Sequence, residues 1–304
     1  MNAQAKPKFT ERGCGLCGAT HVRELYTAKD RLRNSEQVFS IAQCLECGVL
    51  RTLPEMTERE LAEFYPRDYW GGEEPRLQWI KASQKEKIEF LSACGLTGGD
   101  ILDVGCGGGF FLRALDQDKW NCFGVETGQA AANAARRALG EGRIFTGTLI
   151  ESACADEAFD VVTFWSALEH TNEPRENLVE ARRILRRGGS LIVQLPNTAS
   201  YQATMFGGDW FSLDAPRHRY HFTLQTLSSL LSDTGFSLYH KTLFSRAHNA
   251  HALRQSLKSK LFGEQSNAVT RALFYLSIPL IKPFDFLMTA MGKGATLTLA
   301  ARAV

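Results

Sequence analysis

One stretch of the sequence, residues 101–112, constrains the fold more than any other. It begins with the apolar run Ile-Leu-Asp-Val, continues into a glycine-rich turn at Gly105, Gly107 and Gly109, and enters a run of larger residues from Phe110. Glycine allows positive φ angles and brings bare backbone N–H groups close to a ligand, so this pattern is typical of a buried strand, a tight turn and a helix N-terminus. The sequence therefore predicts a parallel α/β sheet with a nucleotide-cofactor site at this turn.

The spacing of the glycines distinguishes between two classes of cofactor. A dinucleotide-binding turn carries Gly-x-Gly-x-x-Gly and leaves a helix N-terminus open to a pyrophosphate, but the last position of that pattern is Phe110 here. Asp103 places a carboxylate beside the turn, where it repels a diphosphate and attracts the ammonium and sulfonium groups of S-adenosylmethionine. S-adenosylmethionine therefore fits the turn better than a nicotinamide dinucleotide. The alternative is a structural turn that holds no ligand.

Further segments resemble the class I S-adenosylmethionine-dependent methyltransferases over residues 80–245. Residues 120–126 resemble the second strand of that fold and end in Glu126, 21 positions after Gly105, where the family places the carboxylate that holds the ribose. Residues 159–165 resemble the fourth strand, and the Ser-Ala-Leu-Glu-His that follows them is common in the small-molecule branch of the family. The order and spacing of these segments argue against a turn without a ligand.

The resemblance implies a Rossmann-like sheet of seven strands, the last of them antiparallel, with helices between the strands. Residues 186–197 supply a Gly-Gly turn and the fifth strand, residues 236–243 and 295–303 supply the sixth and seventh, and a helix is expected at 226–235. Asp160, at the start of the fourth strand, is expected to cap local backbone rather than to touch a ligand. The residues that we expect to bind the cofactor are Asp103, Gly105, Cys106, Gly107, Glu126, Thr127, Thr148, Leu149, Trp165 and Ser166.

Two Cys-x-x-Cys pairs near the N-terminus predict a metal centre. Cys14 and Cys17 form the first pair, Cys44 and Cys47 form the second, 26 residues separate the pairs, and a glycine follows each of them. Two such turns place four thiolates around one point, which is the ligand set of a structural zinc ribbon with no open position for water. Two disulfides are the alternative, but the polar N-terminal residues show no secretory signal, and a reducing cytoplasm favours zinc. The remaining cysteines are expected to pack as small hydrophobic residues: Cys94, Cys106, Cys122 and Cys154.

The sequence predicts three parts in the chain. Residues 1–55 form the zinc ribbon, which includes strands at 38–43 and 49–53. Residues 56–95 supply linker helices, and residues 96–304 supply the methyltransferase domain. The metal is expected to organise the ribbon, because a module of this size is too short to build a sufficient core of its own.

Smaller features lie within these parts. In the linker, Thr57 and Glu60 predict the capping box of a short helix. Tyr69 and Trp70 form an aromatic loop that either closes over the cofactor as a lid or joins the ribbon to the methyltransferase domain. Residues 245–294 are expected to be a helical insertion before the last strand, on the acceptor side or at an interface.

The expected catalytic base comes from the segment that follows the fifth strand. Residues 210–223 gather aromatic rings, histidines and arginines on the side where the methyl acceptor enters in this family. A hydroxyl acceptor must lose a proton, and a histidine is neutral near physiological pH. We expect His218 to be the base, with His221 and His170 as the next candidates. The alternative is that these histidines make ordinary hydrogen bonds in a packed loop.

The charge of the chain is uneven. The net charge is +2, but residues 241–304 carry nine Lys or Arg and two Asp or Glu, which gives +7 and marks a surface for acidic ligands. Arg217 and Arg219 either clamp an anionic group of the acceptor or are solvated. Residues 268–291 are apolar but interrupted by charges and prolines, so they do not read as a membrane span. They form either helices packed over the active site or an interfacial segment that meets lipid.

Taken together, the motifs resemble bacterial methyltransferases of saccharide and surface-polysaccharide biosynthesis. We therefore expect a cytoplasmic enzyme, or one peripheral to the inner membrane face, that methylates a small-molecule acceptor, with a hydroxyl of a saccharide or nucleotide sugar preferred to carbon or nitrogen. A nucleic-acid methyltransferase or binding protein is the first alternative, and residues 165–170 disfavour it because they lack the Pro-Pro-aromatic motif of enzymes that methylate base amines. The second alternative is a scaffold that binds the cofactor without catalysis.

Overall fold

The computed structural model describes residues 8–10, 13–31, 37–65, 77–262 and 283–304. The chain divides into two compact units, and each of them is built from several stretches of sequence. The cysteine unit comprises residues 1–65, 196–227 and 242–297, and the Rossmann unit comprises residues 66–195, 228–241 and 298–304. The three parts expected from the sequence, with boundaries at residues 55 and 95, are continuous stretches of chain, whereas these units group residues that contact one another in space. The expected boundaries therefore stay a prediction.

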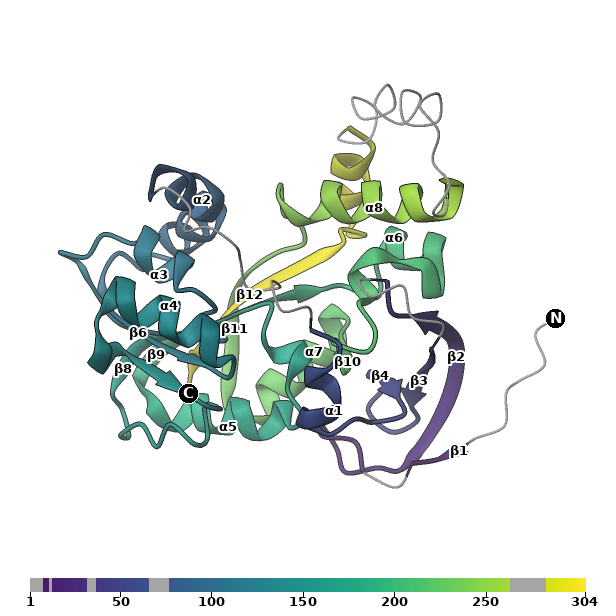
Figure 1. Cartoon of the computed structure of the whole chain (residues 1–304), viewed down its shortest axis with the longest axis horizontal. Coiled ribbons are helices and arrows are strands. Elements are labelled where there is room, and N and C mark those ends of the chain that lie inside the picture. The colour runs from purple at the N-terminus through teal and green to yellow at the C-terminus, as the bar shows by residue number, and fades with distance from the viewer. Residues whose placement is uncertain (1–7, 11–12, 32–36, 66–76, 263–282) are drawn as a thin grey trace. The chain divides into compact units, whose positions relative to one another are not determined.

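A seven-stranded sheet carries the Rossmann unit (Figure 1). Its strands, in spatial order, are β11 (Phe236–Thr242), β12 (Thr296–Ala303), β9 (Leu185–Pro196), β8 (Phe159–Trp165), β5 (Gly99–Val104), β6 (Trp120–Glu126) and β7 (Ile144–Thr146). The pairs formed by β7, β6, β5, β8 and β9 are all parallel, and the last strand of the chain is antiparallel. The expected Rossmann-like fold of seven strands is therefore confirmed.

Helix α2 (Leu77–Ala93) precedes the first strand of this sheet, and the other helices of the Rossmann unit lie between its strands in sequence. These are α3 (Phe110–Ala114), α4 (Gln129–Leu139), α5 (Pro174–Ile184) and most of α7 (Leu224–Asp233), with short 3-10 turns η1 (Glu141–Arg143) and η2 (Leu168–His170). The face that α4 buries consists of small alanines, and a Cβ added at Gly109 would lie 3.2 Å from the Cβ of Ala135. Small residues thus let α4 approach the glycine turn closely. Helix α7 begins two residues earlier than the sequence predicts.

The central strands are apolar along nearly their whole length because both faces of a parallel sheet are covered. Six of the seven residues of β8 are buried, and its bounds are those expected from the sequence. The core of the unit joins α2, the central strands and the start of α3 through Leu91, Ile101, Leu112, Val161 and Ile192, all nearly inaccessible to solvent.

The expected Gly-Gly turn appears as a bulge within β9. Phe159 pairs with Leu185 and Val161 pairs with Ser190, so the four residues 186–189 of β9 lie opposite the single residue Asp160 of β8. Asp160 accepts a hydrogen bond from the backbone N–H of Asp100 at 2.8 Å. Asp160 therefore binds the backbone of the neighbouring strand β5, and it also forms an ion pair with Arg186.

A second sheet of five strands carries the cysteine unit. Its strands, in spatial order, are β1 (Lys8–Phe9), β2 (His21–Lys29), β3 (Val38–Cys44), β4 (Leu50–Leu53) and β10 (Tyr220–His221). The two strands expected in the ribbon are present as β3 and β4. The addition of β10, from the segment that follows β9, was not expected from the sequence.

Short helices complete the cysteine unit. They are α1 (Glu58–Ala62), α6 (Tyr201–Phe206), η3 (Gly207–Asp209), η4 (Phe211–Leu213) and α8 (His248–Phe262), and residues 283–290 are also helical. The capping box of Thr57 and Glu60 at α1 is confirmed. Helix α8 lies in the expected insertion, whereas Tyr69, Trp70 and residues 268–282 lie outside the described residues. None of the helices in the described ranges has both the length and the apolar content that crossing a membrane requires.

Candidate cofactor site, cysteine cluster and acceptor-side segment

The glycine turn connects β5 to α3 and is tied to the neighbouring strand. The backbone N–H groups of Gly105 and Cys106 donate to the carbonyl of Val125 at 2.8 and 3.1 Å. Gly105 has a φ of 73°, and a Cβ at this position would lie 2.8 Å from the Cβ of Ala167. Both the backbone angle and the close approach therefore require glycine. Gly107, with a φ of 54°, continues the turn toward the helix.

Glu126 ends β6 with its carboxylate against the glycine turn. One carboxylate oxygen accepts from the backbone N–H of Gly107 at 2.8 Å, and the other accepts from that of Gly128 at 2.7 Å. The side chain is buried, and this burial raises its pKa. The structure thus brings Glu126 to the turn, where a carboxylate can accept from the hydroxyl groups of a ribose.

Asp103 supplies a second buried carboxylate on β5. It accepts a hydrogen bond from the hydroxyl of Thr163 at 2.7 Å. Burial raises the pKa of Asp103 to about 7, while the positive charge of Lys87 and the hydrogen bond from Thr163 act in the opposite direction. A carboxylate in these surroundings gains from a cationic ligand, because the ligand stabilises its charged form.

Lys87 was not foreseen from the sequence. It projects from α2, and its ammonium lies 5.3 Å from the ring centre of Trp165 and 5.7 Å from that of Phe111. Burial lowers the pKa of Lys87 to about 8. No sequence motif surrounds Lys87, so nothing in the sequence indicated a functional role. The fold brings its ammonium close enough to Asp103 for the two charges to interact.

Trp165 and Ser166 lie at the end of β8, next to β5. The ring of Trp165 packs edge-on against Phe111, with 5.3 Å between ring centres. Its indole N–H is buried and has no hydrogen-bond partner among the described residues. Ser166 adopts a positive φ of 54°. A donor left without an acceptor at the end of a central strand fits a site that a polar ligand completes.

The remaining expected cofactor residues lie along the same edge of the sheet. Thr148 follows β7 and uses its hydroxyl to accept from the backbone N–H of Glu151 at 3.2 Å. Leu149 and Cys106 are buried, and Thr127 is exposed directly after β6. The sheet order reverses direction at β5 and β8, and ligands of open α/β sheets bind beyond the carboxyl ends of the strands at such a point. The donors and acceptors present therefore fit S-adenosylmethionine.

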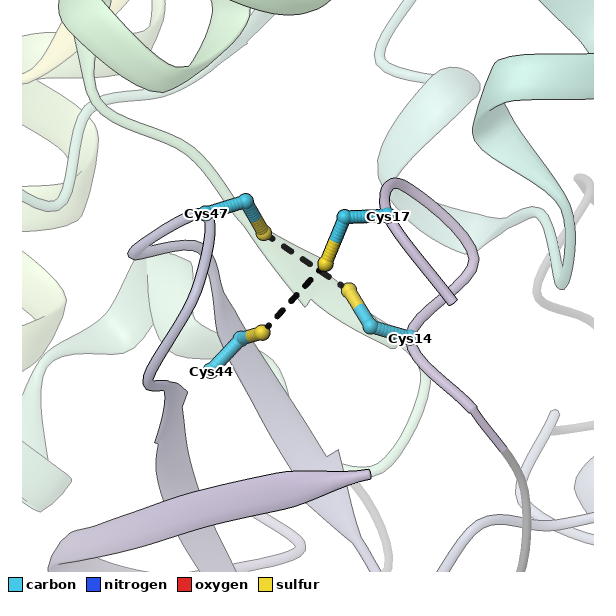
Figure 2. A group of neighbouring side chains, drawn as sticks. All are labelled: Cys14, Cys17, Cys44 and Cys47. Carbon is cyan, nitrogen blue, oxygen red and sulfur yellow. Dashed lines mark hydrogen bonds between the residues drawn. The ribbon is translucent and has the colours of Figure 1, made fainter. Parts of the chain in front are cut away.

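The four cysteines of the two pairs converge on one point (Figure 2). The Sγ atoms of Cys14 and Cys47 are 3.8 Å apart, and those of Cys17 and Cys44 are 3.6 Å apart. A tetrahedral zinc with Zn–S bonds of about 2.3 Å requires sulfurs about 3.8 Å apart, whereas a disulfide requires about 2.05 Å. The cluster thus has the spacing of a four-thiolate zinc site.

The glycines after the two cysteine pairs have a local role. The backbone N–H of Gly18 donates to the carbonyl of Cys14 at 2.7 Å, and that of Gly48 donates to Cys44 at 3.0 Å. Both glycines have a φ of 76°. Each turn thereby curls around its own cysteines, which explains why a glycine follows each pair.

His221 is a buried member of β10. Its Nε2 lies 2.8 Å from the hydroxyl of Thr52, and that hydroxyl also lies 2.7 Å from the backbone carbonyl of His218. The carbonyl can only accept, so the single hydroxyl proton of Thr52 goes to it. The Nε2 of His221 therefore carries a proton and donates to Thr52.

His218 has the opposite tautomer. Its Nδ1 lies 3.0 Å from the carbonyl of Ser212, which can only accept, so Nδ1 carries the proton and Nε2 has the lone pair. Burial lowers the pKa of His218 to about 4 and that of His221 to about 3. Both rings are neutral near pH 7. His170 lies in η2 of the Rossmann unit and is partly buried.

Arg217 and Arg219 are buried and bind protein groups. The guanidinium of Arg217 lies 2.8 Å from Asp30 and 2.6 Å from Asp214, and it donates to the carbonyl of Phe64 at 2.9 Å. Arg219 donates to the carbonyl of Met56. The structure therefore agrees with neither alternative considered for these arginines, an anion clamp or a solvated side chain. Both guanidinium groups bind groups of the protein instead.

Comparison with known proteins agrees with this site. A family model described as a methyltransferase domain matches residues 77–241, more than half of the chain. Two relatives are named ubiquinone biosynthesis O-methyltransferase. The one from Azoarcus sp. (strain BH72) is 30% identical over 136 residues, which cover 43% of this chain and 54% of the relative. The one from Pseudomonas aeruginosa (strain UCBPP-PA14) is 29% identical over 172 residues, which cover 54% of this chain and 74% of the relative.

Among solved structures, a putative sarcosine dimethylglycine methyltransferase from Galdieria sulphuraria shares the fold. It has a TM-score of 0.50 and 17% identity, and the match covers 73% of this chain and 85% of that chain. The chain spans about half the length of the Azoarcus relative, and the names of the relatives give no support to the expected saccharide acceptor. The family model, the seven-stranded sheet and the relatives agree on the remaining point: the chain belongs to the methyltransferase domain family.

Proposed function

We propose that this enzyme transfers a methyl group to a hydroxyl oxygen of a small-molecule acceptor. When bound, S-adenosylmethionine would supply the electrophilic methyl group. Glu126 would accept hydrogen bonds from its ribose, the carboxylate of Asp103 would balance its positive charge, and the indole N–H of Trp165 would donate to one of its polar atoms. The geometry that supports this assignment is the pair of buried carboxylates beside one glycine turn.

We propose His218 as the group that removes the acceptor proton. The observation that carries this proposal is its tautomer: the carbonyl of Ser212 fixes the proton on Nδ1 and directs the lone pair to Nε2. Burial keeps the ring neutral near pH 7. His221 is the weaker candidate because its Nε2–H donates a hydrogen bond to Thr52. His170 is the other candidate, and its variant is measured beside that of His218.

We propose a saccharide or nucleotide sugar as the acceptor, on the resemblance found in the sequence. The relatives in ubiquinone biosynthesis favour testing phenolic hydroxyl groups beside the sugars. The purified enzyme, S-adenosylmethionine and extracts fractionated into the two compound classes are incubated together, and mass spectrometry detects products heavier by one methylene. A nucleic-acid fraction is treated in the same way. Methylation confined to the phenolic fraction would remove the saccharide from the proposal, and methylation of the nucleic-acid fraction alone would overturn it.

The base is tested by replacing His218 with Gln. We expect turnover to fall about 100-fold or more, since general-base catalysis contributes about that much, while calorimetry shows unchanged affinity for S-adenosylmethionine. His21→Gln is the matched control, because His21 is exposed on β2. Normal turnover in His218→Gln together with a large loss in His170→Gln would move the role to His170. Normal turnover in every histidine variant would refute a histidine base and would indicate that the enzyme accelerates the transfer mainly by aligning the acceptor with the methyl group.

We propose that one structural zinc binds to the four clustered cysteines. The spacing of their sulfurs supports it. We also propose contact with an anionic membrane surface through residues 268–291, supported by the net charge of +7 after residue 240 and by the exposed side chains of Phe286, Leu287 and Met291. Sedimentation with vesicles of phosphatidylglycerol tests this contact, and no more binding than to phosphatidylcholine vesicles would refute it.

A further inference from the structure

The segment that carries the proposed base is part of the same sheet as the cysteine pairs. β10 pairs antiparallel with β4, with Tyr220 opposite Arg51 and His221 opposite Leu50. The backbone N–H of Thr52 also donates to the carbonyl of Arg219 at 3.0 Å. β4 begins three residues after the second cysteine pair. The strand that pairs with β10 therefore follows directly from the turn that carries two of the four expected metal ligands.

The first cysteine pair contacts the same segment. The backbone N–H of Gly15, which lies between Cys14 and Cys17, donates to the hydroxyl of Tyr220 at 2.9 Å. The ring of Tyr220 is buried. The direction of this N–H depends on the conformation of the Cys-x-x-Cys turn, which four metal–sulfur bonds would fix. The proposed metal would thus set the position of a hydrogen-bond donor to β10.

Thr52 forms the most direct link to the histidines. Its hydroxyl donates to the backbone carbonyl of His218 and accepts from the ring of His221. Thr52 is buried, so water does not readily replace either partner. A single hydroxyl on β4 therefore orients the backbone at one histidine and the ring of the other.

A buried ion pair fixes the residue before His218. Arg217 is joined to Asp30, directly after β2, and both side chains are fully buried. Three parts of the cysteine unit thus contact residues 217–221: Asp30 directly after β2, the strand β4, and the first cysteine turn.

We propose that Thr52 is a positioning residue of the methyltransferase and that the cysteine cluster, through β4 and Gly15, holds His218 in place for proton removal. This inference rests on the proposed role of His218. It assigns the N-terminal module to the acceptor side of the reaction and not to nucleic-acid binding. Cofactor binding is independent of the cluster, because the residues that we assign to the cofactor lie in the Rossmann unit.

The first test compares Thr52→Val with Thr52→Ser. Valine has nearly the shape of threonine but no hydroxyl, whereas serine keeps the hydroxyl. We expect Thr52→Val to lower turnover at least 10-fold, to increase amide hydrogen exchange in residues 217–222, and to shift the ring ¹⁵N NMR signals of His221, with unchanged affinity for S-adenosylmethionine. Thr52→Ser should restore all three properties. Unchanged exchange and ring signals in Thr52→Val would overturn the proposal.

The second test removes the metal from the full-length protein. We expect Cys47→Ser, or chelation of the wild-type protein, to increase exchange in residues 217–222 at least 10-fold and to leave residues 101–104 protected. Cys154→Ser is the matched control, because Cys154 is outside the cluster. Unchanged exchange after confirmed metal loss would refute the inference. If His218→Gln remains active while Thr52→Val and metal loss alter exchange, the base assignment fails and the positioning of the segment stands.

Discussion

The ion pair between Arg217 and Asp30 permits a quantitative test of how the cysteine unit is held together. Both side chains are fully excluded from solvent, and 2.8 Å separates the guanidinium from the carboxylate. The guanidinium also binds Asp214 and the carbonyl of Phe64. Arg217→Met keeps the apolar stem but leaves Asp30 without its guanidinium. Removal of one partner from a buried ion pair costs about 3 to 5 kcal/mol, and we expect that loss in the free energy of unfolding.

A double-mutant cycle separates the charge effect from packing. Asp30→Asn alone leaves Arg217 beside Asp214, so we expect a smaller loss of about 1 to 3 kcal/mol. The double variant removes both charges, and its loss should fall short of the sum of the single losses by about 1 to 3 kcal/mol. Urea unfolding, followed by amide exchange within the cysteine unit, provides the free energies.

An exposed ion pair serves as the control for this cycle. Arg175 and Asp233 are 3.0 Å apart in the Rossmann unit, with side chains 33% and 58% exposed. Arg175→Met should cost less than about 1 kcal/mol, because water screens the pair and solvates the partner that remains. If Arg217→Met costs no more than Arg175→Met, the burial argument is wrong.

Three further predictions concern the cofactor, the metal and pH. Glu126→Ala should weaken binding of S-adenosylmethionine by about 1 to 3 kcal/mol in calorimetry, because a buried charged acceptor is lost; an unchanged dissociation constant would remove Glu126 from the site. Elemental analysis of protein purified without chelator should find one zinc per chain, and a chain without zinc contradicts the metal assignment. Burial holds the pKa of His218 at about 4 and that of His221 at about 3, below the ordinary value of 6.5. The unfolded state therefore binds more protons on these two rings below pH 6.5, which destabilises the fold by about 3 kcal/mol per histidine between pH 6.5 and 4. Asp103, whose pKa burial raises to about 7, acts in the opposite direction over this range. Urea unfolding therefore compares the wild-type protein with His218→Gln: the wild type should lose about 3 kcal/mol more over this range, and an equal pH dependence would contradict the burial of the His218 ring.

The Rossmann sheet could be predicted closely because its signals are local. Residues 120–126 and 159–165 are mostly apolar, each is followed by a polar residue, Thr127 or Ser166, and the structure places β6 and β8 at those bounds. A strand buried on both faces is mostly apolar, so its sequence indicates where it begins and ends. The capping box of α1 was predictable for a similar reason, since its two residues lie three positions apart.

The contacts that define the cysteine unit could not be predicted in this way. Arg217 and Asp30 are 187 positions apart, and neither residue type in isolation indicates a buried partner. In the sequence, Arg217 lies among aromatic rings and histidines, a pattern that equally suits an anion-binding loop. Lys87 is a similar case, because its approach to the rings of Trp165 and Phe111 follows from the packing of α2. Contacts between residues far apart in the sequence leave no periodic pattern in it, and they depend on tertiary packing alone.

The hydrophobic core of the cysteine unit joins the N-terminal residues, which carry the cysteine pairs, to residues 201–215. Phe39 and Ile41 of β3 are fully buried, and they share one cluster with Trp210, Leu213 and, from the insertion, Leu253. A module of about 50 residues cannot bury enough apolar surface alone, so it needs either a metal or a partner surface. This chain has the ligands for the metal and also provides the surface. Because the two stretches share a core, a change that loosens the cysteine turns should also reach the backbone around the proposed base, through the bond from Gly15 to Tyr220 and through the buried hydroxyl of Thr52.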